Sequence, residues 1–203
     1  MPTCQVIFKC RIQELASPVR TCSTMFACFP KNLRFMDHIL NDETGGIDFD
    51  RYLRYLNSIQ DRLPIHVYSF ASDSRNFDFH SRSSLHDAWL DTITINETAS
   101  GDRNDVRRIA INICLLGPYH DRKIHLHYTG VERYQFDTPT RHGDPRFNHT
   151  GHGDLFTHEV RLGERSLLIH ELEFERGTTV LIECADFRHS EEITAVKPGN
   201  GGS

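Results

Sequence analysis

The sequence lacks the motifs by which most enzyme classes are recognised. It contains no G-x-S-x-G elbow, no P-loop and no dinucleotide-binding fingerprint. His170 and Glu171 do not begin an H-E-x-x-H zinc motif, because Phe174 stands where the second histidine is needed. A Ser-His-Asp or Cys-His-Asp triad stays open, since triads assemble in space. The sequence therefore favours a protein that is not an enzyme.

Long apolar runs and basic runs are also missing. Without an apolar run of sufficient length, the sequence predicts neither a signal peptide nor a membrane span. The net charge of −5 and the absence of a basic stripe argue against nucleic-acid binding. Residues 1–35 carry five basic residues and one acidic residue, whereas residues 36–203 carry 18 basic and 27 acidic residues, a balance of −9. An acidic body predicts a protein partner with a basic surface.

Closely spaced cysteine pairs are absent. Cys4, Cys10, Cys22 and Cys28 follow a C-x5-C-x11-C-x5-C pattern, which lacks the C-x2-4-C pairs of zinc sites. Cys114 and Cys184 lie within apolar strand patterns, so we expect both to be buried. Because nothing in the sequence requires disulfides, it predicts a cytoplasmic protein.

The change in charge near residue 35 also suggests how the chain is divided. We expect an N-terminal extension at residues 1–35, one globular domain at 36–196 and a flexible Gly-rich tail at 197–203. Residues 1–30 lack a clean helical or strand period, so they are predicted to be dispensable for folding.

One helix is clearly indicated at residues 48–62. Its apolar positions are three or four residues apart, as on one face of a helix. Asp48 is placed to cap the first turn, and Pro64 ends the helix after Leu63. The helix should therefore cover a sheet with the face formed by Phe49, Tyr52, Leu53, Leu56 and Ile59.

The rest of the chain alternates with a period of two. This pattern predicts about eight short strands, at 65–71, 76–80, 88–95, 109–116, 123–129 with an extension through 131–136, 155–162, 166–174 and 178–185. Polar loops are expected at 96–105 and 137–154, and a tight turn at 175–177. Since no segment is long enough for crossover helices, the fold class is mainly β (α+β), an antiparallel sandwich or curled sheet with one covering helix.

Histidines are abundant, with thirteen in the chain. His125 and His127 share one strand face and resemble, together with Glu132, the H-x-H-x4-E part of the first cupin motif. The match ends at Pro139, where a cupin has glycine. We expect no cofactor. The alternative is a divalent metal in a β-barrel or sandwich enzyme, held by a cluster comprising His125, His127, His142 and His152, with His158, Asp144 and Asp154 nearby.

A second resemblance covers more of the chain. Residues 84–90 (SLHDAWL) and 92–95 (TITI) resemble the LHDA-x-L entry into the first strand of small bacterial β-rich proteins, some of which are immunity proteins of polymorphic toxin systems. Residues 115–122, 128–131 and 170–187 fit the same style, so the likeness extends over 65–189. It implies a cytoplasmic bacterial protein and transfers no catalytic residue. Within it, Asp87 should hold a turn, and Trp89 and Leu90 should enter the core.

The sequence therefore predicts a non-enzymatic protein-binding module, of immunity type by resemblance. Loops on a rigid sheet carry most recognition, which makes 96–105 and 137–154 the expected contact elements.

Overall fold

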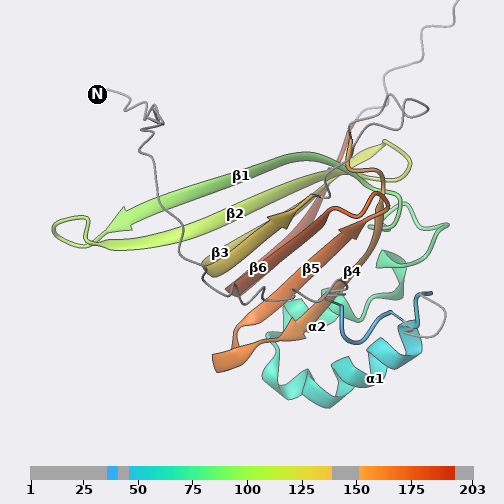
Figure 1. Ribbon diagram of the computed structural model, residues 1–203, viewed down its shortest axis with the longest axis horizontal. Helices are drawn as coiled ribbons and strands as arrows, with labels where there is room; N and C mark the ends of the chain where they lie inside the picture. Colours follow the sequence, from blue (N-terminus) through green and yellow to red (C-terminus); the bar gives the residue numbers. More distant parts are fainter. Residues whose placement is uncertain (1–35, 41–45, 139–150, 195–203) are drawn as a thin grey trace, which may run out of the picture. The chain divides into compact units, whose positions relative to one another are not determined.

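A six-stranded antiparallel sheet forms the centre of the protein (Figure 1). The computed structural model describes residues 36–40, 46–138 and 151–194. The strands follow one another in the order β1-β2-β3-β6-β5-β4. They are β1 (Trp89–Ser100), β2 (Val106–Leu116), β3 (Arg122–Asp137), β4 (Leu155–Leu162), β5 (Leu168–Phe174) and β6 (Thr179–Ile193). The predicted fold class is confirmed, with six longer strands in place of about eight short ones.

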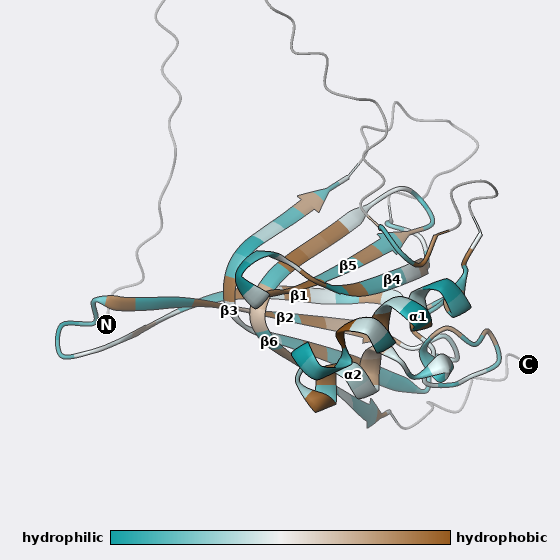
Figure 2. Ribbon diagram, turned by 90° about the horizontal axis from the view of Figure 1, so that it is seen from below, coloured by the Kyte–Doolittle hydropathy of each residue, from teal (hydrophilic) through white to brown (hydrophobic). Residues whose placement is uncertain are grey.

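The sheet curls because β3 and β6 bend together (Figure 2). At the bend, Gly130 has a φ of +59°, and a Cβ atom there would lie 2.8 Å from the Cβ of Ala185. The curl brings the start of β1 against the start of β4. Leu155 N donates to Ala88 O, and Asp87 N donates to Leu155 O, both at 2.9 Å. The two edge strands thus meet at this one point.

The predicted helix at 48–62 is confirmed. It consists of α1 (Phe49–Ile59) and a single 3-10 turn, η1 (Gln60–Arg62). Asp48 caps it by accepting a hydrogen bond from Arg51 N at 2.8 Å. Tyr52, Leu56 and Ile59 are buried in the core and Phe49 packs against it, whereas Leu53 of the predicted face is half-buried and lies outside the core.

Two predicted strands are wrong. Residues 65–71 form the helix α2 (Ile65–Ala71), and 76–80 comprise the last residue of η2 (Ser74–Asn76) and the turns after it. The buried residues of α2 are Val67, Phe70 and Ala71. Phe70 and Ala71 follow Val67 by three and four positions, the spacing of one helical face. A run of seven residues with mixed polarity fits either period, and here packing against β6 selects the helix.

The predicted polar loop at 96–105 is wrong in its first half. Strand β1 continues to Ser100 and β2 begins at Val106, so only 101–105 form the turn. The pairing continues from Asn96 opposite Ala110 to Ser100 opposite Val106. Because these residues have no core to face, their composition carries no strand pattern.

In β2 and β3, the residues predicted to share an apolar face are the buried ones. Ile111, Ile113 and Leu115 of β2 are buried, as are their neighbours Ile124, Leu126 and Tyr128 of β3. Gly177, with a φ of +77°, makes the predicted hairpin between β5 and β6. Cys114 and Cys184 are both buried, as expected. No helix in the described residues is long and apolar enough to cross a membrane.

Candidate binding surfaces

His125 and His127 lie on the outer face of β3, the face away from Leu126 and the core. They share this face, as predicted. His127 Nδ1 hydrogen bonds with Asn112 Oδ1 at 2.5 Å, and His125 Nε2 lies 3.5 Å from Glu192 Oε2. Each ring therefore has a polar neighbour from an adjacent strand.

Only some of the other predicted ligands lie in the described residues. His142 and Asp144 lie outside the described residues. His152 Nδ1 hydrogen bonds with Thr178 Oγ1 at 3.0 Å, and His158 is buried in the core. Metal binding by His125, His127, His142 and His152 therefore stays a prediction.

One group of three potential metal ligands does come together in the described part of the chain. Oxygen or nitrogen atoms of Asp37, His38 and Glu159 lie within 4.8 Å of one another. However, the Glu159 carboxylate already accepts hydrogen bonds from Asp37 N at 3.1 Å, His38 N at 2.7 Å and Ile39 N at 2.8 Å, and from Arg161 Nη1 at 3.3 Å. With its acceptor positions occupied and a guanidinium beside it, Glu159 is better suited to fasten residues 37–39 to β4 than to bind a cation.

The LHDA segment occupies the point where the sheet edges meet. Leu85 and Ala88 are buried, and His86 Nδ1 donates to Phe156 O at 2.7 Å. Asp87 adopts a φ of +64°, which forms the turn predicted for it. Trp89, however, is 47% exposed, so its predicted burial is wrong. The segment closes the sheet, which is a structural role.

The edge strand β4 is covered by α1. The hydroxyl of Tyr52 donates to Val160 O at 2.9 Å and accepts from Val160 N at 2.7 Å. Tyr55 Oη accepts from Leu162 N at 3.0 Å. Two tyrosine hydroxyls thus satisfy backbone groups that an edge strand otherwise leaves open to another chain.

The opposite edge strand, β1, has no such cover. After the bridge between Trp89 and Asp154, β1 has no backbone partner other than β2 in the described part of the chain. From Thr94 to Ser100 every residue of β1 is exposed. We call residues 94–108 the arm, because this end of the β1–β2 hairpin extends away from the helices (Figures 1 and 2). From Thr98 to Arg108 the arm is a two-stranded ribbon, because β2 pairs with β3 only from Ile109 onward.

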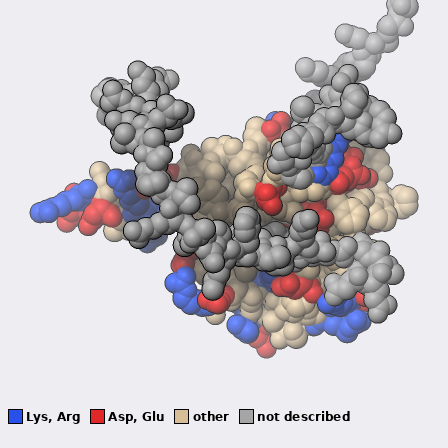
Figure 3. Space-filling view, in the orientation of Figure 1, with Lys and Arg blue, Asp and Glu red and all other residues tan. Residues whose placement is uncertain are grey.

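The arm carries charges of both signs (Figure 3). Its acids are Glu97, Asp102 and Asp105, and its bases are Arg103, Arg107 and Arg108. Arg107 Nη1 lies 3.1 Å from Glu97 Oε1 across the two strands. Ile95 is 45% exposed and Val106 is 44% exposed, so apolar surface accompanies the charges.

Three histidines surround Phe70 of α2 in the interior. The ring centroids of His158, His170 and His189 lie 5.5, 5.8 and 5.0 Å from that of Phe70. Burial lowers the pKa of His158 to about 3, and it also lowers the pKa of His170 and His189. His158 Nδ1 hydrogen bonds with His170 Nε2 at 3.2 Å, and the Tyr128 hydroxyl with His170 Nδ1 at 2.8 Å. The cluster is therefore neutral at physiological pH.

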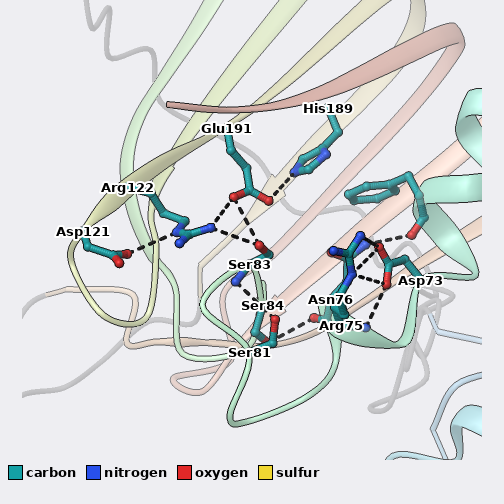
Figure 4. A network of polar contacts seen from close by, with 11 residues as sticks. Asp73, Arg75, Asn76, Ser81, Ser83, Ser84, Asp121, Arg122, His189 and Glu191 are labelled. Carbon is teal, nitrogen blue, oxygen red and sulfur yellow. Dashed lines mark hydrogen bonds and ion pairs between the residues drawn. The ribbon is translucent and has the colours of Figure 1, made fainter. Parts of the chain in front are cut away.

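Beside this cluster lies an open cavity of about 500 Å³, which is lined by residues of α2, η2 and β6. It lies along the part of β6 beyond Cys184, where β5 no longer pairs with it. A polar network closes one end (Figure 4): Glu191 accepts from Arg122 Nη1 at 2.5 Å and from Ser83 Oγ at 3.2 Å, and Arg122 Nε donates to Asp121 at 3.1 Å. Sequence reasoning missed this cavity, because its walls come from segments more than 100 residues apart.

No protein-family model and no curated protein matches this chain significantly.

Proposed function

We propose that this protein is a non-enzymatic binding module that accepts a segment of another protein along the free edge of β1. The observation that carries the proposal is the difference between the two edges of one sheet. The hydroxyls of Tyr52 and Tyr55 occupy backbone groups on the edge of β4. On β1, the backbone groups from Leu90 to Ser100 that point away from β2 have no partner within the described chain.

The sequence of β1 lacks the usual protection of an exposed edge. Natural proteins blunt such strands with lysine, proline, bulges or short length. Residues 92–100 (TITINETAS) contain neither lysine nor proline, and the only register shift in the β1–β2 pair lies earlier, between Leu90 and Thr92. An extended segment of a partner could therefore add to β1 by main-chain hydrogen bonds.

The low stability expected of the arm is a physical reason to expect a binding partner there. A two-stranded ribbon with both faces in water is only marginally stable by itself. A third strand would pair the open backbone groups and cover Ile95, one of the exposed apolar residues of the arm. The acidic balance of residues 36–203 favours a partner with a basic surface, whose approach it would accelerate.

Shortening the arm tests the proposal. In one variant, residues 97–109 are replaced by Asn-Gly, which leaves a two-residue turn between Asn96 and Ala110. We expect the parent to capture a specific partner from its native cells, at low but not high salt, and the shortened protein to capture none. Arg103→Gln, at the tip of the intact arm, is the matched control and should retain the partner. Capture by the shortened variant, or recovery of a small-molecule product without a partner, would overturn the proposal.

A further inference from the structure

The cavity beside α2 contains carboxylates that are already engaged. Asp73 accepts from Arg75 Nε at 3.0 Å and from Arg75 Nη2 at 2.6 Å, and this pairing lowers the pKa of Asp73. Glu191 is held by Arg122 and Ser83. A ligand therefore meets carboxylates whose charge is compensated within the protein.

The donors around the cavity are less fully used. Arg75 bonds Asp73 through Nε and Nη2 only, so Nη1 has no partner in the described residues. Arg188 is 76% exposed, and its nearest acid, Asp186, is 3.9 Å away, beyond hydrogen-bond distance. Two guanidinium groups, one from η2 and one from β6, therefore keep N–H groups for an oxyanion.

The imidazole of His189 is a third unsatisfied group. Its Nε2 is buried without a hydrogen-bond partner, and Glu191 Oε1 is 3.8 Å away. Buried polar atoms in native proteins are nearly always paired. The ring lines the cavity, but this nitrogen is out of reach of solvent and adds no ligand contact in the structure as it stands.

The floor of the cavity is apolar. Phe70 and Phe187 are 7% and 1% exposed, and their ring centroids lie 5.4 Å apart in an edge-to-face arrangement. Ligand pockets typically combine such a floor with a few placed polar groups, in volumes of about 300–1,000 Å³. The cavity, at about 500 Å³, is of that size.

We propose that this cavity binds a small organic anion, in which a carboxylate or phosphate is joined to an apolar group. The anionic oxygens lie at Arg75 and Arg188, and the apolar group lies on Phe70 and Phe187. This site is separate from the arm, so either proposal can fail without the other.

Amide chemical shifts of the full chain test the site, with phenyl phosphate and phenylacetate as probes. We expect at least one probe to shift the amide signals of Ser69, Asn76 and His189 in a saturable manner. Benzyl alcohol, which lacks the anion, and inorganic phosphate, which lacks the ring, should each bind at least about tenfold more weakly. The preference between phosphate and carboxylate identifies the anionic group.

Arg188→Gln provides the decisive variant, because this exposed side chain is not needed for the fold. We expect it to weaken probe binding about tenfold or more. Arg103→Gln removes the same charge at the tip of the arm and should leave probe binding unchanged. The proposal is overturned if neither probe shifts these signals, if Arg188→Gln binds as the parent does, or if benzyl alcohol or inorganic phosphate binds equally well.

Discussion

Glu159 combines the chemistry of a metal ligand with the surroundings of a structural residue. Its side chain is fully buried, and four donors surround its two oxygens. Three of these donors are consecutive backbone N–H groups, which the two carboxylate oxygens accept together. Arg161, which also bonds Glu171 at 2.8 Å, supplies the compensating charge.

Replacing Glu159 with glutamine should therefore destabilise the protein by about 2–4 kcal/mol. The glutamine amide group would place a donor against one of the backbone N–H groups. It would also remove one of the negative charges that balance the buried guanidinium of Arg161. Denaturant unfolding measures the loss. Glu132→Gln is the matched control, because Glu132 is 46% exposed and forms an ion pair with exposed Arg165. It should change stability by less than about 0.5 kcal/mol.

The buried histidines make stability depend on pH. The pKa of a histidine in an unfolded chain is about 6.5, and burial lowers the pKa of His158, His170 and His189 in the folded protein. The unfolded state therefore binds more protons. The stability contributed by these neutral rings is complete above pH 6.5 and is lost as pH falls toward the folded-state values, about 3 for His158.

Other charged groups modify this dependence. Glu191 and Asp73 act on His189 and oppose the effect of burial on its pKa. Burial raises the pKa of Glu171 to about 7, so protonation of Glu171 adds stability as pH falls from 7 toward 4.5. We predict that His158→Gln unfolds with a pH slope smaller than that of the parent by about 1.4 kcal/mol per pH unit between pH 6 and 4. Equal slopes would show that His158 is protonated in the folded state.

At the scale of elements, the sequence predicts the helices and strands that have one apolar face and one polar face. Helix α1 and strands β2 and β3 have one buried face and one polar face, and the hydrophobic period identifies them. Helix α2 is too short for its period to be distinguished from a strand, and only its packing on β6 decides. The arm has no buried face at all, so nothing in its composition distinguishes it from a loop.

The candidate sites follow the same logic. The arm lies where the sequence predicted a contact loop, but its strand character, and hence the open edge, comes from pairing with β2. The cavity depends on side chains such as Arg75 and His189, which only the tertiary fold brings together. The predicted histidine pair on β3 lies on one face, because side chains alternate between the two faces of a strand. Metal binding also needs ligands from other segments, and the alternation within one strand does not predict where those lie.

Gly130 controls the bend of the sheet. Alanine there would hold a positive φ and place its Cβ 2.8 Å from that of Ala185. We predict that Gly130→Ala lowers the free energy of unfolding by about 2–3 kcal/mol. In Gly151→Ala the new Cβ meets nothing within 4 Å, so thermal melts of this control should match the parent. A Gly130→Ala protein as stable as that control would show that the bend does not require glycine.

At the scale of the whole molecule, the described core begins at Met36. Met36, Ile39 and Leu40 are buried in it. We predict that residues 36–203 alone unfold cooperatively, with a Tm close to that of the full chain. Residues 41–203 should melt at a lower temperature, because they lack these contacts and leave Glu159 buried without its backbone donors. Loss of cooperative unfolding in the longer fragment would place residues 1–35 in the core.

The curled sheet treats its two edges differently, and the proposed function depends on that difference. Amide hydrogen exchange, measured with and without the captured partner, tests it most directly. The account predicts that binding slows exchange at amides of residues 92–100 that point away from β2, while amides of β4, already covered by α1, change little. Slowed exchange confined to other parts of the protein, with 92–100 exchanging as in the free protein, would contradict it.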